Sequence, residues 1–287
     1  MPTIRAIKSR IKSAQNIAQI TKAMQMVAAS KMRRAQDQAS AGKPYANKLA
    51  EMLFQVASFT SDEAHPLLRQ NESNKSLFVL FSSDRGLTGG LNTNLFKFAV
   101  EQMADQDTEV IAIGRKAREF CRKTGLNMIA EYTGWSDKSK FEQVLPIAET
   151  VIERYLDGSY GSIYMIYMQF LSTLSQKPAI QQLLPLAYHT VSQPDSLVQI
   201  QKEYLFEPSP KEIMEQLLPY YIEVELYQTL LEAKASEHSA RMVSMKNASE
   251  NAKDVISDLK LIYNKSRQAS VTKELNEITV AMLSLAG

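Results

Sequence analysis

One turn of the chain has the residue types and the position that phosphate-binding sites use. Residues Ser83 to Asn92 read SDRGLTGGLN and stand between an apolar run and a helical stretch, which is where phosphates often bind. The turn lacks the G-x-G-x-x-G order of dinucleotide sites and the Lys-Ser/Thr pair of a P-loop. We therefore interpret it as a tight structural turn in which Asp84 or Asn92 caps backbone amides. Its predicted structural residues are Asp84, Gly86, Gly89 and Gly90.

The other titratable side chains form no catalytic set. His238 stands beside Glu237, but neighbouring residues of a helix point about 100° apart and no nucleophile accompanies them, so we interpret it as a surface or interface histidine. Cys121 lies in a basic stretch without an identifiable histidine partner, which favours a structural role. The histidines His65, His189 and His238 have no Cys or carboxylate at ligand spacing. The sequence therefore predicts no catalytic residue, no metal site and no cofactor.

Positive charge gathers at the start of the chain. Every charged residue before Asp37 is basic, namely Arg5, Lys8, Arg10, Lys12, Lys22, Lys31, Arg33 and Arg34. Three interpretations are open: a solvated helix face, an acid-poor amphipathic transit peptide, or a surface that meets carboxylates or phosphates of a partner. The helical pattern continues without a cleavage-like break, which disfavours the transit peptide. Nucleic-acid binding lacks support because no aromatic residues interleave with these charges for base stacking.

A long N-terminal helix must position these charges. Between Thr3 and Ala41 there is neither Gly nor Pro, and small or flexible apolar residues recur at three- or four-residue steps, as in an amphipathic helix. The apolar positions are Ile4, Ile7, Ile11, Ala14, Ala18, Met24, Ala28, Met32, Ala35 and Ala39. The pattern resumes after Gly42 and Pro44, so we expect the helix to reach about Phe59, with room for a kink.

The C-terminal region repeats this pattern. From Tyr220 to Ala286 there is no Gly and no Pro, and Ser209 before Pro210 predicts an N-cap and a first helical residue, with Pro219 interrupting the helix early. The predicted stripe is Met242, Met245, Ala248, Ala252, Val255, Leu259, Ile262, Ser266 and Ala269, continued by Leu275, Ile278, Met282 and Leu285. Because one long helix cannot hide such a stripe, we expect the two terminal helices to pair as an antiparallel coiled coil.

The middle of the chain predicts an α/β fold. Strands are expected at Leu77–Phe81, Val110–Ile113, Met128–Tyr132, Ile163–Phe170 and Ala179–Ala187, and helices at Asn94–Asp105, Arg115–Lys123 and Phe141–Leu156. This alternation implies a Rossmann-like domain with a mainly parallel sheet. The predicted domains are an N-terminal coiled-coil helix (1–60), the α/β domain (75–190), a connection and foot segment (191–209) and a C-terminal helix (210–287). The two terminal helices form one discontinuous shaft.

Composition sets further bounds. The chain of 287 residues is 45% hydrophobic, which suits a protein with a real core. A formal net charge of +2 gives no bulk field of the kind that marks a nucleic-acid binder. A single cysteine excludes an internal disulfide. No apolar run reaches about 18 residues, so we expect any membrane contact to be indirect.

Three segments together resemble the gamma subunit of F-type ATP synthases from end to end. They are Ile20–Met32 (ITKAMQMVAASKM), the turn Ser83–Asn92, and the stretch from Ser236 to Ile278 with SEHSARM, LIYNKSRQA and TKELNEI. The resemblance implies a central rotor stalk without chemistry of its own. Such a stalk couples ion translocation through a membrane ring to ATP synthesis or hydrolysis in an alpha-beta hexamer, and influences regulation of the ATPase.

The resemblance also implies partners and contact residues. The partners are the alpha and beta subunits, the epsilon subunit and the membrane c-ring, with one copy of the chain per complex and no nucleic acid. Lys22 and Met24 match positions that face an acidic loop of beta, and the tip from Leu275 would turn inside an apolar bearing. The full hexamer-facing set is Lys22, Met24, Arg33, Arg241, Gln268, Thr272, Leu275, Ile278 and Met282. Tyr204 and Glu207 would touch the ring or epsilon.

Some positions depart from the family pattern. Thr88 stands where the family usually has cysteine, which argues against a thiol role there. Thr279, Val280 and Ala281 replace a more glycine-rich pattern. With no cysteine-bearing insertion and no presequence, the resemblance points to a bacterial member, peripheral on the cytoplasmic side of the inner membrane. Two rival classes stay open on the residues alone: an enzyme built on the α/β domain, and a coiled-coil scaffold unrelated to rotary motors.

Overall fold

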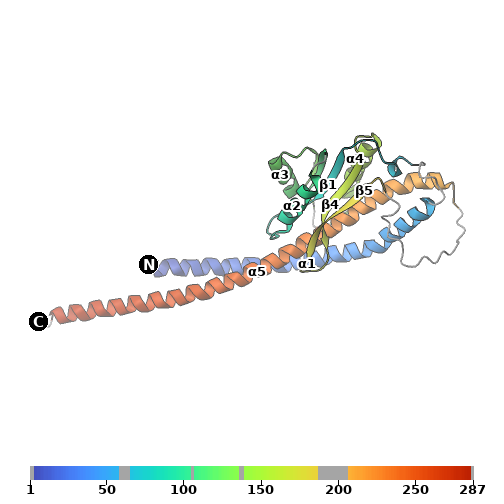
Figure 1. Ribbon diagram of the computed structural model, residues 1–287. Coiled ribbons are helices and arrows are strands. Elements are labelled where there is room, and N and C mark those ends of the chain that lie inside the picture. The colour runs from blue at the N-terminus through green and yellow to red at the C-terminus, as the bar shows by residue number, and fades with distance from the viewer. Residues whose placement is uncertain (1–2, 58–64, 105–106, 136–138, 187–205, 286–287) are drawn as a thin grey trace. The chain divides into compact units, whose positions relative to one another are not determined.

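The computed structural model describes residues 3–57, 65–104, 107–135, 139–186 and 206–285. Its helices are α1 (Ile4–Ala57), α2 (Leu91–Met103), α3 (Arg115–Thr124), α4 (Leu145–Leu156), α5 (Pro210–Leu285) and the 3-10 helices η1 (Pro66–Leu68) and η2 (Phe141–Gln143). Its strands are β1 (Ser76–Phe81), β2 (Thr108–Ile113), β3 (Met128–Tyr132), β4 (Ser162–Phe170) and β5 (Gln176–Leu184) (Figure 1). The predicted helix and strand ends at Phe59, Asp105 and Ala187, and the segment 191–205, lie outside the described residues.

The chain divides into two compact units. The described residues of 1–28 and 241–287 form the first, here called the helix-pair unit, and those of 29–240 form the second, here called the sheet unit. The predicted domain boundaries at 60, 75, 190 and 209 are placed where the sequence pattern changes and not by compactness, and they stay a prediction.

The helix α1 confirms the prediction of a long N-terminal helix. It begins at Ile4, after Thr3, whose side-chain Oγ1 accepts a hydrogen bond from the Ala6 amide at 3.3 Å. The helix continues through Gly42 and Pro44 as far as Ala57. The proline is tolerated because buried side chains on the same turns, among them Ala46 and Leu49, hold the helix against the sheet unit's core.

The helix α5 begins where the sequence predicts but is not interrupted. The Ser209 Oγ accepts a hydrogen bond from the Glu212 amide at 3.3 Å, and Pro210 is the first helical residue. The expectation that Pro219 interrupts the helix is wrong, because the helix runs through it. A proline inside a helix costs about 3 kcal/mol, but Leu218 and Ile222 on the neighbouring turns are buried in the core, and each contributes about 1.5–3 kcal/mol.

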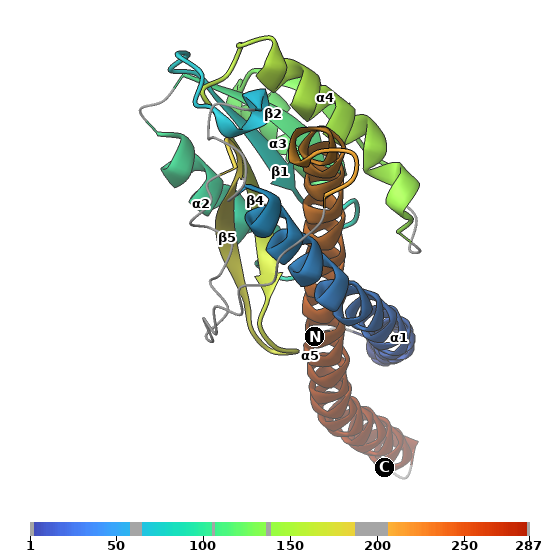
Figure 2. The same ribbon diagram turned by 90° about the vertical axis from the view of Figure 1, so that its right-hand side faces the viewer.

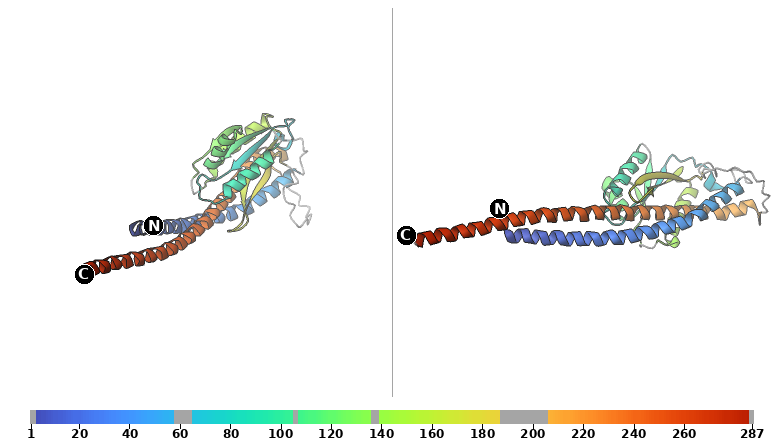
Figure 3. Two further views of the ribbon diagram at one scale, coloured as in Figure 1. Left: turned by 60° about the vertical axis from the view of Figure 1, so that its left-hand side comes forward. Right: turned by 90° about the horizontal axis from the view of Figure 1, so that it is seen from below.

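The helix-pair unit is an antiparallel pair, as predicted. In Figure 3 the first part of α1 lies beside α5 within the helix-pair unit, and the two helices run in opposite directions. Ile7, Ala14 and Ala28 of α1 and Met245 of α5 are buried. The Ser249 hydroxyl of α5 donates a hydrogen bond to the Ala18 carbonyl of α1 at 3.3 Å. Small residues on both helices allow this close approach of the two backbones.

The predicted stripe of α5 is wrong at one heptad position. Val255 and Ile262 are 50% and 48% exposed, and Ala269 is exposed as well. The inward places one residue further along belong to Ile256, Tyr263 and Ser270, which are partly buried. Besides the predicted Ala248, which is partly buried, the buried and partly buried residues from Met245 onward form a stripe of Met245, Ser249, Ala252, Ile256, Leu259, Tyr263, Ser266 and Ser270. They alternate steps of four and three, which is the heptad repeat of a coiled coil.

The sheet unit contains a five-stranded sheet of order β3-β2-β1-β4-β5. The pairs β1–β2, β1–β4 and β2–β3 are parallel, and β5 lies antiparallel to β4. The predicted, mainly parallel α/β fold is confirmed. The central strand β1 is buried along its whole length, as expected for a parallel strand with both faces covered.

Helices cover both faces of this sheet. One core joins the sheet to α4 and to parts of α1 and α5, through side chains such as Leu53, Val151 and Ile222. The other core joins it to α2 and α3, through Leu95 and Cys121. Figure 2 shows α4 and α2 on opposite sides of the strands. The predicted helix Phe141–Leu156 is divided into η2 and α4.

Candidate partner-binding surfaces

A groove with two lysines runs along the helix-pair unit. It has a volume of about 340 Å³ and is lined by Ala18, Gln19, Lys22, Ala23, Met26, Ser249 and Lys253. The Lys22 ammonium donates a hydrogen bond to Gln25 Oε1 at 3.2 Å and its side chain is exposed. Met24 is half-buried on the side that pairs with α5. The groove therefore offers positive charge beside small apolar side chains.

The other predicted contact residues occupy different surfaces. Arg33 is exposed and belongs to the sheet unit, whereas Arg241 is half-buried in the helix-pair unit. Gln268 and Thr272 are exposed on α5. Glu207 is exposed next to the start of α5, and Tyr204 lies outside the described residues. The structure brings Gln268, Thr272 and the tip residues onto one helical segment and leaves Arg33 and Glu207 in the other unit.

The end of α5 is exposed over its last described turns. From Val271 to Met282 every side chain is exposed, and Figures 1 and 3 show α5 continuing past the start of α1. The heptad places that would continue the paired stripe are Lys273, Glu277 and Val280. Lys273 and Glu277 form a surface ion pair at 3.6 Å, and Val280 is exposed, so no core forms here. The side chain of Leu285, the last predicted tip residue, lies outside the described residues.

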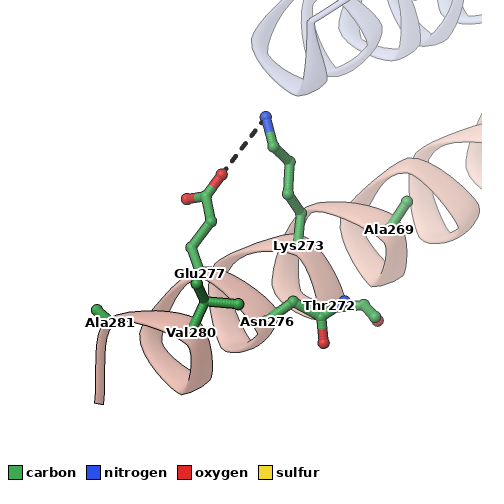
Figure 4. Close-up of a pocket in the computed structure, with 7 residues that line it drawn as sticks. All are labelled: Ala269, Thr272, Lys273, Asn276, Glu277, Val280 and Ala281. Carbon is green, nitrogen blue, oxygen red and sulfur yellow. Dashed lines mark ion pairs between the residues drawn. The ribbon is translucent and has the colours of Figure 1, made fainter. Parts of the chain in front are cut away.

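The apolar residues of this end lie on a different face of the helix. Val271, Leu275, Ile278 and Met282 keep steps of four and three but are offset by one or two residues from the paired stripe. Leu275, Ile278 and Met282 are 58%, 56% and 63% exposed. Around the ion pair lies an open hollow of about 790 Å³, lined by Ala269, Thr272, Lys273, Asn276, Glu277, Val280 and Ala281 (Figure 4). The change of face indicates a change of partner.

The turn after β1 is held together by its own polar groups. Asp84 Oδ1 accepts a hydrogen bond from the Arg115 amide at 2.9 Å, and Asp84 Oδ2 accepts one from the Trp135 amide at 2.9 Å. The Asn92 amide donates to the hydroxyls of Ser83, at 2.8 Å, and Thr88, at 3.3 Å. Asp84 thus caps the start of α3 and the loop after β3, while Asn92 closes the turn itself.

Only one of the three predicted turn glycines needs its conformational freedom. Gly89 has a φ of +59°, whereas a Cβ at Gly86 would meet no atom within 4 Å. The more demanding glycine is Gly114, which the sequence analysis does not single out. Its φ is +91°, and a Cβ there would come 2.3 Å from the Ser82 carbonyl oxygen.

Comparison with known proteins decides the family. A family model described as ATP synthase matches residues 3–285. The ATP synthase gamma chain of Pelotomaculum thermopropionicum is 43% identical over 97% of both chains, and that of Chloroflexus aurantiacus (strain ATCC 29366 / DSM 635 / J-10-fl) is 43% identical over 99% of both. The chain belongs to the ATP synthase gamma chain family. The rotor of the mitochondrial ATP synthase of Euglena gracilis shares the fold, with a TM-score of 0.66, 20% identity, and coverage of 93% of this chain and 98% of that one.

This family member also buries a polar segment that the sequence analysis misjudges. The residues Lys234, Ala235, Ser236, Glu237, His238 and Ser239 of α5 are all buried. The interpretation of His238 as a surface or interface histidine is wrong, since only 4% of it is exposed. The signal in the sequence is the run of small residues Ala235, Ser236, Ser239 and Ala240, which lets other backbone approach the helix closely.

Burial sets the ionisation of several groups in this family member. Burial raises the pKa of Cys121 to about 11, so its thiol stays protonated at neutral pH. Burial also raises the pKa of Glu225, against hydrogen bonds from Gln181 and Tyr221 that lower it. Burial likewise raises the pKa of Glu232, which Lys43 lowers and Glu225 raises further. In the described parts of the chain no three metal-ligating side chains cluster, and no helix has the length and apolarity to cross a membrane.

Proposed function

We propose that this chain is the central rotor stalk of a rotary ATP synthase and performs no chemistry of its own. It would couple ion translocation through a membrane ring to ATP synthesis or hydrolysis in an alpha-beta hexamer, and influence regulation of the ATPase. The observation that carries the proposal is the family match over residues 3–285 together with the exposed apolar end of α5. In this proposal 1–60 and 210–287 act as one shaft, joined by 191–209 to the domain 75–190.

The surfaces support the contact residues that the family resemblance implies. Lys22 and Arg33 would meet carboxylates of the hexamer, because every charged residue in this part of the chain is positive. Met24 would add an apolar contact beside Lys22. Arg241, Gln268 and Thr272 would contribute polar contacts to the same hexamer. Leu275, Ile278 and Met282 would turn in an apolar bearing, which explains why their apolar stripe leaves the face that pairs with α1. Tyr204 and Glu207 would contact epsilon or the c-ring.

The mechanism would be mechanical coupling through differential contact. A shaft with a basic side on one helix and an apolar end on the other presents different groups to each catalytic subunit as it turns. The shaft can shift the equilibrium between two conformations of a partner subunit only by the difference in its binding free energy for the two. ATP binding and hydrolysis would then belong to the hexamer, and the chain would supply the differences in binding free energy.

We further propose that the chain sits on the cytoplasmic side of a bacterial inner membrane, as a peripheral subunit. Support comes from the bacterial sources of relatives that share about two fifths of its residues. Contact with the membrane would pass through the c-ring and not through the chain itself.

A reconstitution experiment tests the rotor function. The ATPase activity of the purified chain is measured alone, and then after co-purification with the alpha and beta subunits of its own organism. We expect the chain to be inert alone and to form a complex with one copy per hexamer, whose activity exceeds that of the hexamer by itself. ATP hydrolysis by the chain alone would support the enzyme class instead, and failure to join the hexamer would support a scaffold.

A further inference from the structure

The buried hydroxyls of α5 contact one strand and the hairpin that follows it. In the sheet unit, Thr229 Oγ1 lies 3.6 Å from the sulfur of Met165, and the Ser236 hydroxyl donates to the Met168 carbonyl at 2.8 Å. The Ser239 hydroxyl donates to the Thr173 carbonyl at 2.6 Å. Met165 and Met168 belong to β4, and Thr173 lies in the turn between β4 and β5. The three contacts therefore advance along α5 and along β4 in the same direction.

These hydrogen bonds fall where β4 no longer pairs with β1, although it still pairs with β5. The pairing of β4 with β1 ends at Ile166, opposite Leu80, and Met168 lies beyond that point. The serine hydroxyls also depart from the usual habit of mid-helix serines, which bond a carbonyl of their own helix. Ser236 and Ser239 are 0% exposed, and Met168 is buried as well, so water does not compete with the Ser236 hydroxyl for the Met168 carbonyl. Thr173 is partly buried. The contacts are thus specific links between helix and hairpin.

Two hydroxyls three residues apart fix a helix in a way that apolar packing cannot. Ser236 and Ser239 share one face of α5 and are separated by about 4.5 Å along its axis. Burial of apolar surface is non-directional, so a helix held only by apolar side chains can slide or rotate slightly against a sheet. Hydrogen bonds prefer a narrow range of angles, and two of them define both the axial position and the rotation of the helix.

The hairpin that accepts these bonds is itself firmly built. Residues Gln169 and Phe170 of β4 pair with Lys177 and Gln176 of β5. Across the turn, the Leu171 amide donates to the Ser175 carbonyl at 3.2 Å. The Gln176 side-chain amide donates to the Thr173 carbonyl at 3.3 Å and to the Ser239 hydroxyl at 3.4 Å. A force on the sheet therefore reaches the serine contacts through paired backbone.

We propose that Ser236 and Ser239 are positioning residues that lock α5 to the β4–β5 hairpin and so pass torque from the sheet unit into the helix. The inference rests on the proposed rotor function. Ser239 is the last but one residue of α5 within the sheet unit, since Arg241 already belongs to the helix-pair unit. The two serines thus lie among the last residues of α5 that belong to the sheet unit.

The test uses the assembled complex with three versions of the chain. They are the wild type, the double variant Ser236→Ala and Ser239→Ala, and the control Ser257→Ala, which removes an exposed hydroxyl of the same helix. Ser239→Ala alone is a milder variant, because the Thr173 carbonyl keeps its bond from Gln176. A bead is attached to the sheet unit through Lys97→Cys, an exposed position of α2, while the hexamer is fixed to the surface.

Two readouts separate locking from general stability. Hydrogen exchange of the β4–β5 hairpin amides is expected to be roughly 10-fold faster or more in the double variant, because two buried hydrogen bonds hold the closed state. The angular variance of the bead in the absence of nucleotide is expected to rise in the double variant, and less in Ser239→Ala. Complex yield should match that of the control. The midpoint of thermal unfolding is expected to fall, because two buried hydrogen bonds are lost, so the variance of the bead decides: a merely structural role would lower the midpoint and leave the variance unchanged.

The outcomes distinguish this inference from the rotor function. If the wild-type complex rotates and the double variant shows the same angular variance as the wild type, the lock is overturned and the rotor function stands. A wild-type complex in which the bead does not rotate with ATP overturns both. If the double variant does not assemble, Ser239→Ala decides: a variance equal to that of Ser257→Ala overturns the lock.

Discussion

At the scale of single residues, Asp84 joins more of the sheet unit than its place in a turn suggests. Its carboxylate accepts hydrogen bonds from the amides of Arg115 and Trp135, which lie 31 and 51 residues further along the chain. Hydrogen bonds to a charged acceptor are stronger than neutral ones. The side chain therefore holds the end of β1, the start of α3 and the loop after β3 in one arrangement.

Replacing Asp84 by Ala should destabilise the sheet unit by about 1–3 kcal/mol. The amides of Arg115 and Trp135 would lose their acceptor, and their desolvation on folding would no longer be offset by a hydrogen bond. Chemical unfolding of the full chain, followed by far-ultraviolet circular dichroism, measures the change. Gly86→Ala in the same turn is the control, since a Cβ there meets no atom within 4 Å. Equal unfolding midpoints for the two variants would show that the capping bonds contribute nothing.

The buried Glu225 predicts a dependence of stability on pH. Burial raises the pKa of Glu225 in the folded chain above its unfolded value. Below the unfolded pKa the side chain is neutral in both states and costs no folding free energy. As the pH rises through the folded pKa, the buried side chain must ionise and the folded chain becomes less stable. Glu225→Gln should therefore stabilise the chain, and the gain should grow from pH 4.5 to pH 8, on the order of the range of carboxyl titration. The exposed Glu250→Gln is the control.

Unfolding free energies of wild type and variant across that pH range measure the effect. Tyr167, Tyr221, Glu232 and Lys43 also face this region, so the comparison is made within each pH and not between pH values. A gain that shrinks as the pH rises would contradict burial as the dominant influence on Glu225.

At the scale of elements, the periodicity of the sequence predicts which helices and strands form better than it predicts which residues contact one another. The long helices and the parallel sheet follow from spacing and from apolar runs, and their centres agree with the structure. The start of β5 does not, because Gln176, Lys177 and Pro178 are poor strand formers, and pairing with β4 imposes their conformation. The partners of Asp84 could not be predicted, since the amides that it binds are remote in sequence and meet only in the folded sheet unit.

The heptad phase of α5 is the clearest case of this limit. Spacing alone places Val255 and Ile262 on the stripe, but the structure turns Ile256 and Tyr263 inward instead. Both phases have steps of three and four, so only the partner helix selects between them. Ser249, held against the Ala18 carbonyl, fixes the phase that the apolar pattern leaves open.

The two phases make a matched prediction. Ile256→Ala should lower the unfolding free energy of the full chain by about 1–2 kcal/mol, because it removes part of a half-buried side chain from the pair. Val255→Ala, one residue away, should change it by less than about 0.5 kcal/mol, as for an ordinary surface substitution. Thermal or urea unfolding monitored at the helix signal measures both. The reverse order of the two losses would restore the stripe predicted from the sequence.

At the scale of the whole molecule, both long helices contribute residues to both compact units. Their sequences change character along their length accordingly. In the sheet unit α5 carries buried Leu, Ile and Tyr side chains, and in the helix-pair unit it carries a mixture of small and large residues at heptad spacing. Past Ser270 it carries an exposed apolar stripe on another face. The first two segments go with different surroundings, and in the last segment every described side chain from Val271 to Met282 is exposed.

The exposed end of α5 predicts that its apolar residues matter to assembly and not to folding. Leu275→Asp with Ile278→Asp should leave the unfolding free energy of the free chain within about 0.5 kcal/mol of the wild type, because both side chains are exposed there. The same variant should lose most of its affinity for the alpha-beta hexamer, since two charges would have to enter an apolar bearing. Asn264→Asp, exposed on the same helix, supplies the matched control.

Size-exclusion chromatography of the chain with its own alpha and beta subunits, together with ATPase activity of the isolated complex, measures the assembly. The control variant should co-elute with the hexamer and raise its activity as the wild type does. If the double variant also assembles and activates normally, the end of α5 does not enter an apolar site, and its exposed stripe needs another explanation. If it fails to fold alone, the stripe contacts this chain itself, which would contradict the exposure of Leu275 and Ile278.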